Sequence, residues 1–161
     1  AYCQNNEISW LDWEQASSAE GEALTAYVAR LIRIRHDNPV LRCRHFLHGK
    51  DELAPGILDI AWFDTHGDII PPESWNNPEK RLFAVRRASR EVDGTVTVLT
   101  LFLNPSEADR VYRLPTQGVP TRLIIDSAGP DESERDIEGP EITVVSRSAV
   151  LTKNVLPAPS S

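Results

Sequence analysis

The stretch TVTVLTLFL, residues 95–103, consists of threonine, valine and leucine with one phenylalanine. Such β-branched and bulky apolar residues favour extended chain, and the apolar character of both faces is typical of a central strand. Short segments of similar composition surround it, separated by clusters of Gly, Pro, Asn and Asp: 57–63, 81–86, 109–114, 121–126, 141–145 and 148–152. With no helical pattern between them, these segments predict an antiparallel β-sandwich. Its expected buried residues are Val98, Leu99, Leu101, Leu123, Ile125 and Val150.

One helix is expected ahead of the strands, over residues 18–37. Ser17 with Glu20 matches a capping box, and Asn38-Pro39 ends the pattern. An apolar stripe recurs at three- and four-residue spacing, formed by Leu24, Tyr27, Val28 and Leu31. Because a helix with such a stripe is stabilised mainly by burying it, the sequence predicts a large partner surface. Self-association through helix 18–37 is one way to supply that surface. The polar, acidic segment 127–141 is expected to be an exposed loop.

Composition excludes several classes of function. The chain has 161 residues, 40% of them hydrophobic, and a formal net charge of -7. It is therefore large enough to form a core, and it lacks the clustered basic residues that bind nucleic acid. No apolar run reaches membrane-spanning length, so we expect no membrane partner. Cys3 and Cys43 are too widely separated to form a metal knuckle. They favour reduced thiols in a cytoplasmic protein, and a single bridge between them remains an alternative.

Metal binding is weighed at two places. His45 and His48, followed by Asp51 and Glu52, could in principle hold zinc, but a pair without a third placed ligand is more often a surface feature. DTHGD, residues 64–68, is similar to the start of a calcium-binding loop, but a glycine after two polar residues between apolar segments indicates a hairpin turn. We therefore expect neither a metal nor a cofactor.

The opening stretch AYCQNNEISWLDWE, residues 1–14, followed by a helix, resembles bacterial glycogen debranching enzymes and isoamylases of the alpha-amylase superfamily. In that family the matching stretch follows the last strand of the catalytic barrel. One departure is Asn6, where the family more often has aspartate. Further similarity follows in the family's order: LRCRHFLHG (41–49), DIAWFDTHGD (59–68), LFLNP (101–105), YRLP (112–115) and RSAVL (147–151).

The resemblance implies a domain plan. Residues 1–39 would be the end of a catalytic (β/α) barrel, 40–56 a connection, and 57–161 a C-terminal β-sandwich. It also implies retaining hydrolysis of α-1,6 branch linkages in glycogen or related glucans by an aspartate nucleophile and a glutamate acid/base at the ends of barrel strands. Those carboxylates would lie upstream of Ala1. We therefore expect no catalytic residue in this chain and no hydrolytic activity from the segment alone.

Polar side chains at the start of the chain are the expected substrate contacts, because amides and a phenol are usual partners of sugar hydroxyls. They are Tyr2, Gln4, Asn5 and Asn6. Asp12 and Glu14 are expected to be helix-entry charges or members of a loop salt bridge, and not a catalytic pair.

Four tryptophans could instead stack on sugar rings. Trp10 and Trp13 are expected to bury against the following helix, and Trp62 and Trp75 to pack in the core. An exposed Trp62 or Trp75 would favour the alternative function, a non-catalytic glucan-binding module.

Overall fold

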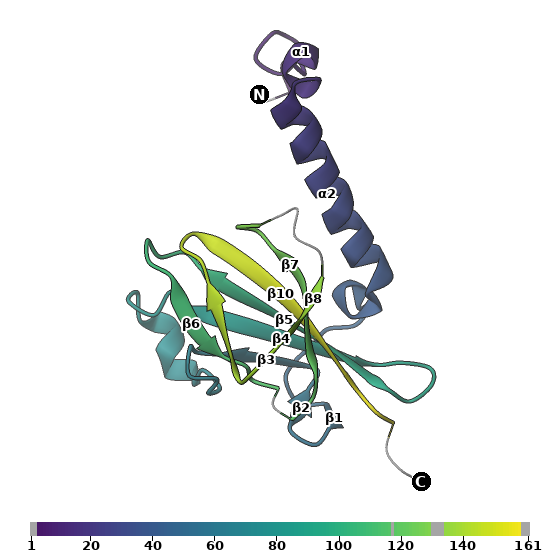
Figure 1. The fold of residues 1–161 in the computed structure, drawn as a ribbon, viewed down its shortest axis with the longest axis vertical. Helices are drawn as coiled ribbons and strands as arrows, with labels where there is room; N and C mark the ends of the chain where they lie inside the picture. Colours follow the sequence, from purple (N-terminus) through teal and green to yellow (C-terminus); the bar gives the residue numbers. More distant parts are fainter. Residues whose placement is uncertain (1–2, 117, 130–133, 159–161) are drawn as a thin grey trace. The chain divides into compact units, whose positions relative to one another are not determined.

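The computed structural model describes residues 3–116, 118–129 and 134–158 (Figure 1). The chain divides into two compact units, Ala1–Arg42 and Cys43–Ser161. In the part of the chain that the structure describes, ten strands in antiparallel sheets follow the two α-helices, which confirms the expected mainly β fold with one long helix ahead of it. Among the described residues, no helix has both the length and the apolar character needed to span a membrane.

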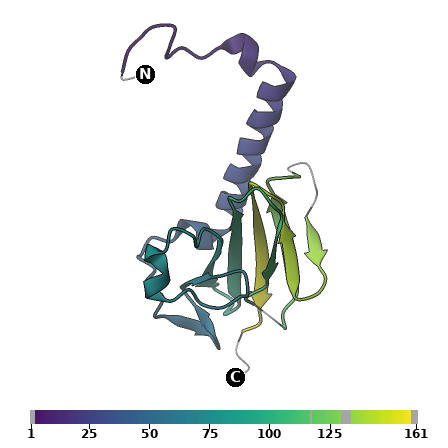
Figure 2. The same ribbon diagram turned by 90° about the vertical axis from the view of Figure 1, so that its left-hand side faces the viewer.

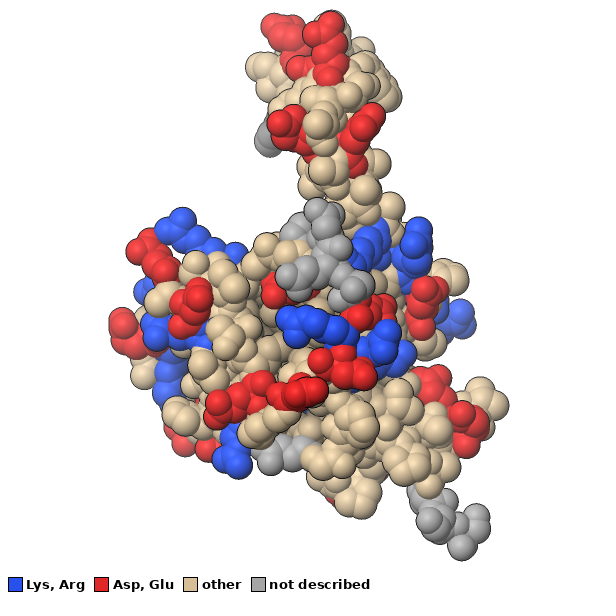
Figure 3. Space-filling model, viewed as in Figure 1, with Lys and Arg blue, Asp and Glu red and all other residues tan. Residues whose placement is uncertain are grey.

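The first unit holds both α-helices and a short 3-10 helix. They are α1 (Trp13–Ala16), α2 (Ala19–Asp37) and the 3-10 turn η1 (Pro39–Arg42). Helix α2 begins one residue later than the predicted capping box implies, because the Ser18 side chain, and not that of Ser17, accepts the N–H of Gly21. At the other end the Asn38 side chain donates to the carbonyl of Ile34. Acidic side chains gather where α2 begins and suit the positive end of its dipole (Figure 3).

A glycine allows α1 to approach α2. A Cβ on Gly21 would lie 2.4 Å from the carbonyl oxygen of Gln15 and 2.5 Å from that of Ala16. Both distances are far below a van der Waals contact, so only glycine fits the turn between these helices.

The second unit is built on a six-stranded antiparallel sheet with the order β3-β4-β5-β10-β7-β8 (Figures 1 and 2). Two short ribbons, β1-β2 and β6-β9, accompany it. The strands are β1 (Glu52–Ala54), β2 (Ile57–Leu58), β3 (Ile60–Phe63), β4 (Phe83–Arg90), β5 (Val96–Asn104), β6 (Arg110–Arg113), β7 (Thr121–Asp126), β8 (Arg135–Ile137), β9 (Glu141–Val144) and β10 (Ser148–Leu156).

The main core lies between one face of this sheet and the β6-β9 ribbon, in a sandwich-like arrangement. Phe102 of β5 and Tyr112 of β6 are both fully buried, with ring centroids 5.5 Å apart in an edge-on contact. The Tyr112 hydroxyl donates to the carbonyl of Leu103 at 2.6 Å. Residues from both layers complete the cluster: Ala61, Phe63, Ala84, Leu114, Leu123, Ile142, Val144 and Val150.

Polar residues also tie the second unit together. Asn104, 1% exposed, donates through Nδ2 to the carbonyls of Ala108, Val144 and Val145 and thereby joins β5 to the β6-β9 ribbon. The Arg86 guanidinium carbon lies 4.8 Å from the centroid of the Phe63 ring, over its face. Burial lowers the pKa of Arg86.

Most of the expected core is confirmed: Val98, Leu99, Leu123, Ile125 and Val150 are buried. Leu101 is the exception, because its side chain is only half-buried. It pairs with Val85 and Leu151 on the sheet face opposite Phe102, and its exposure is not that of an edge position, since β5 lies between β4 and β10. Leu99 on the same face is 2% exposed, so the cover of this face does not extend fully over Leu101.

Three segments differ from the prediction. Segment 57–63 is two strands, β2 and β3. Residues Glu52–Ala54 form β1, and Arg135–Ile137 form β8 inside the expected loop 127–141. At β8, the charge of Arg122 is matched by Glu134 at 2.9 Å and Asp136 at 3.6 Å, so an acidic segment becomes an edge strand. Figure 3 shows the mixed basic and acidic side chains on this unit.

The hairpin turn expected at residues 64–68 is confirmed. The N–H of Asp64 donates to the carbonyl of Asp68, and Gly67 has a φ of 82°. The Asp64 carboxylate accepts the N–H groups of His66 and Asp68. The carboxylate therefore shapes the turn.

Candidate functional site

The opening loop brings three of the four expected substrate-contacting residues together. Tyr2 lies outside the described residues. The side-chain oxygens of the other three all accept hydrogen bonds within the loop: Asn5 from the indole N–H of Trp10 at 2.7 Å, Asn6 from the N–H of Ile8 at 3.2 Å, and Gln4 from the Asn6 amide at 3.1 Å. Gln4, Asn5 and Asn6 thus hold the loop in shape, and they lie on an exposed segment.

Trp10 and Trp13 are 62% and 74% exposed, so the prediction that they bury against the helix is wrong for this chain. Trp10 is instead fixed by its indole hydrogen bond to Asn5. Asp12 is the N-cap of α1, accepting the N–H of Gln15 at 3.0 Å, and Glu14 lies in the first turn. The two carboxylates are helix-entry charges, as expected.

Helix α2 leaves its apolar residues in solvent. Within α2, all of which the structure describes, no residue is buried. Leu24 is 63% exposed, Ile32 65%, Val28 44% and Leu31 39%. Ile8, Leu11 and the two tryptophans of the same unit are also exposed, and such a concentration of exposed large apolar side chains is typical of a surface that meets a partner.

A pocket of about 340 Å³ lies beside the tryptophans of the second unit. Trp75 comes from the 3-10 helix η2 (Pro72–Asn76) and meets Trp62 of β3 edge-on at 5.2 Å. Lys80 and His66 line the same pocket and add polar groups to its rim. Trp62 is half-buried and Trp75 is 51% exposed, so the predicted core packing does not hold for Trp75. An exposed aromatic face beside polar side chains is able to bind a sugar ring.

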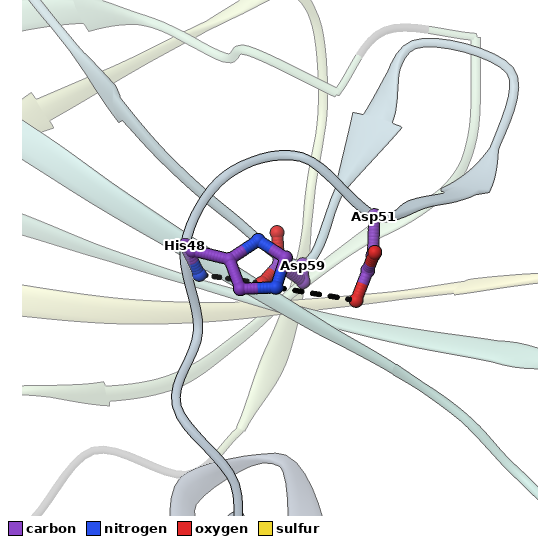
Figure 4. A group of neighbouring side chains, drawn as sticks. All are labelled: His48, Asp51 and Asp59. Carbon is purple, nitrogen blue, oxygen red and sulfur yellow. Dashed lines mark hydrogen bonds and ion pairs between the residues drawn. The ribbon is translucent and has the colours of Figure 1, made fainter.

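A third cluster joins His48 and Asp51 with Asp59, which the sequence reading did not select (Figure 4). His48 Nε2 lies 3.8 Å from Asp51 Oδ2. Burial alone would raise the pKa of Asp59, but the N–H groups of His48 and Ile60, the His48 charge and the N–H of Gly49 hold it below its ordinary value. The carboxylate is therefore ionised. His45 and Glu52, the other two residues weighed for zinc, are not in the cluster.

The signal for Asp59 was present in the sequence as a carboxylate just before an apolar strand. The spacing of residues does not show that Asp59 lies beside His48, because the two meet only through backbone hydrogen bonds between the loop of His48 and the start of β3. Cys3 and Cys43 form no disulfide with one another in the described chain.

Two curated relatives match part of the chain. The glycogen debranching enzyme of Cronobacter sakazakii is 35% identical over 82 residues, and that of Dickeya chrysanthemi is 33% identical over 82 residues. Each match covers 51% of this chain but only 11% of the relative's length. No family model matches the chain.

Proposed function

We propose that this chain is the C-terminal segment of a cytoplasmic glycogen debranching enzyme, a glycoside hydrolase that cleaves α-1,6 branch linkages in glycogen or related glucans. The observation that carries the proposal is the 35% identity over 82 residues to a protein named for that activity. The order of the motifs along the chain, from the opening stretch to RSAVL at 147–151, supports it. Branched α-glucan is then the substrate of the parent protein.

The segment's own role in this proposal is structural. The apolar surface of residues 8–32 requires a cover, and the outer wall of a catalytic barrel would supply one. Residues 1–39 would complete that barrel, 40–56 connect, and 57–161 form the accessory sandwich. The catalytic carboxylates would lie in the rest of the parent enzyme, so the segment alone has no hydrolytic activity.

Substrate contact, in the same proposal, belongs to the opening loop. Gln4, Asn5 and Asn6, with Tyr2, would face the glucan. Each amide oxygen has two lone pairs, so one that already accepts within the loop can still accept from a sugar hydroxyl.

A chimera tests the proposal. The matching segment of the Cronobacter sakazakii relative is replaced by this chain, and release of reducing sugar from glycogen is measured against the parent and against a version lacking the segment. We expect the chimera to keep at least a tenth of the parent's activity and the deletion to lose it. A chimera that is folded by circular dichroism, yet as inactive as the deletion, would overturn the assignment.

The isolated chain provides the second arm. It should release no reducing sugar from branched or linear glucans. Turnover that scales with the amount of chain and survives repurification would contradict the structural role.

A glucan-binding module is the second candidate, and the exposed Trp75 beside its pocket favours it. Maltooligosaccharide titration separates the two functions. Binding at the pocket requires saturable quenching of tryptophan fluorescence that Trp75→Ala abolishes and Trp13→Ala leaves intact. Quenching that Trp13→Ala removes would place the sugar on the first unit instead.

We also propose that, without a covering domain, copies of the chain associate through helix 18–37. The exposed Leu24, Val28 and Leu31 support this. Sedimentation across a concentration range should show self-association that the double variant Leu24→Glu/Leu31→Glu abolishes. A concentration-independent monomer, identical in the double variant, would exclude it.

A further inference from the structure

The loop of residues 43–51 is fastened to the start of β3. The N–H of His48 donates to Asp59 Oδ2 at 2.9 Å, and the N–H of Asp59 donates to the carbonyl of Asp51 at 2.9 Å. Between them Gly49 has a φ of 68°, and a Cβ at that position would lie 3.2 Å from the carbonyl oxygen of Ile60. The backbone thus sets His48 and Asp51 on either side of Asp59.

Three ligand atoms converge at this place. One atom each from His48, Asp51 and Asp59 lies within 4.8 Å of the other two, and His48 Nε2 is 3.8 Å from Asp51 Oδ2. In Figure 4 the Asp59 carboxylate lies directly behind the imidazole ring. The side chains of His48 and Asp51 are 49% and 64% exposed, so both are able to rotate toward a shared ion.

Asp59 is the anchor of the cluster and carries the independent observation. The residue is 3% exposed, and its backbone is fixed on both sides, by Asp51 and by the N–H of Ala88, which donates to its carbonyl at 3.0 Å. While Oδ2 accepts the N–H of His48, Oδ1 is buried and no donor of the described chain meets it with hydrogen-bond geometry, so the N–H groups of Ile60 and Gly49 act on the carboxylate only as nearby dipoles. A buried carboxylate oxygen without a partner is costly, and a cation beside it would remove that cost.

We propose that His48, Asp51 and Asp59 bind a divalent transition-metal ion of the Zn²⁺ type, which clamps the loop 43–51 to the sheet. One imidazole and two carboxylates form a ligand set that zinc accepts, with a fourth position left for water. Tetrahedral bonds of about 2.0–2.1 Å place ligand atoms roughly 3.3 Å apart. The His48–Asp51 pair must therefore close by about 0.5 Å, and the pairs with Asp59, which lie within 4.8 Å, by at most about 1.5 Å. Ca²⁺ and Mg²⁺ fit less well, because they prefer six or more oxygen ligands. This site is independent of the proposed glucan function.

The test uses the whole chain, purified without a polyhistidine tag and treated with chelator. Zn²⁺ is titrated by calorimetry, and thermal unfolding is followed with and without Zn²⁺, Ca²⁺ and Mg²⁺. We expect one Zn²⁺ per chain and a rise in Tm of several degrees with Zn²⁺ alone, since an ion that binds only the folded state stabilises it. His48→Gln and Asp51→Asn should each weaken the Kd at least tenfold.

Three controls keep the result interpretable. His45→Gln changes an exposed histidine of the same loop and should leave the Kd unchanged. Co²⁺ in place of Zn²⁺ distinguishes this site from Cys3 or Cys43, because thiolate ligands give intense near-ultraviolet charge-transfer bands that imidazole and carboxylate ligands lack. Asp59→Asn should abolish binding, and if it fails to fold the two exposed variants still decide the matter.

Either of two outcomes overturns the proposal. The first is the absence of any Zn²⁺-dependent change in Tm or heat of binding. The second is binding that His45→Gln weakens as much as His48→Gln and Asp51→Asn do, or that carries a thiolate signature.

Discussion

The two units of the chain treat their apolar residues in opposite ways. In the second, Phe102, Tyr112 and Val150 are fully buried between a six-stranded sheet and a two-stranded ribbon. In the first, α2 buries none of its residues, and Leu24, Trp10 and Trp13 are each more than 60% exposed. The contrast shows that an apolar pattern in the sequence predicts which residues favour burial, but not whether the same unit contains a surface that covers them. The second unit contains both layers of its core, whereas the described residues of the first unit leave their large apolar side chains exposed.

The largest loss of stability is expected from a substitution in the core of the second unit. Phe102→Ala removes a fully buried ring and its contact with Tyr112, and should lower the free energy of unfolding by about 3–5 kcal/mol. Urea unfolding followed by circular dichroism measures it. Leu24→Ala, on the exposed face of α2, is the matched control and should change the value by less than about 0.5 kcal/mol. Equal losses would mean that both units depend on one core.

Alkaline pH should weaken the same core through Tyr112. Burial raises the pKa of Tyr112 to about 12, above the ordinary value of 10.0. Between these values the unfolded chain loses the phenolic proton while the folded chain keeps it, so stability present below pH 10 is lost as pH rises toward 12. Two pKa units correspond to roughly 2.7 kcal/mol.

Urea melts from pH 9 to 12 should show this fall, and Tyr112→Phe should flatten the part of it that belongs to this residue. A wild-type slope that survives unchanged in Tyr112→Phe would assign the alkaline loss to other groups.

The next largest loss of stability is expected from Asn104, whose side chain joins the sheet to the β6-β9 ribbon. Asn104→Ala removes the amide donor to the carbonyls of Ala108, Val144 and Val145, of which that of Ala108 still accepts from the Ser106 hydroxyl, and should cost about 2 kcal/mol. Asn104→Asp keeps the acceptor for the N–H of Ser106 but loses the three donor contacts, so it should be at least as harmful. A neutral result for both would show that the ribbon is held by apolar packing alone.

The smallest effect is expected in the first unit, where the Ser18 side chain caps α2. Ser18→Ala removes the cap on the N–H of Gly21, and should reduce the stability of α2 by about 1 kcal/mol while the melting midpoint of the β unit stays the same. Amide exchange of the first turn of α2 measures the fraying. Ser17→Ala is the control, because the side chain that caps α2 is that of Ser18. Faster exchange in Ser17→Ala than in Ser18→Ala would restore the capping box first read from the sequence.

The fold was predictable where local pattern and tertiary context agree. Apolar runs, alternation and turn residues located β5, β7 and β9, and the 64–68 turn, because in those segments the local pattern agrees with the burial that the fold gives them. Leu101 was misjudged because it shares a sheet face with the buried Leu99, and only tertiary packing decides which of the two is fully covered. β8 was missed because its charges are balanced across strands by Arg122, a long-range pairing that no local window contains.

The candidate sites were predictable to a lesser degree, since they depend on where loops return. The helix-entry position of Asp12 follows from local spacing and was one of the two alternatives expected for it, whereas α1 itself was not predicted. The meeting of His48 with Asp59, 11 residues apart, depends on a loop held by backbone hydrogen bonds, and the exposure of Trp75 depends on η2. Neither is encoded in a short motif.

The order of strands has a consequence for how the polypeptide matures. β10, the last strand of the described chain, lies between β5 and β7 and is the sole bridge between β3-β4-β5 and β7-β8. During synthesis the earlier strands therefore leave the ribosome with two open sheet edges, each offering unpaired backbone groups to neighbouring nascent chains. Closure must wait for residues 148–156. Premature termination or proteolysis before Ser148 would leave two half-sheets prone to aggregation, and not a shortened but folded sandwich.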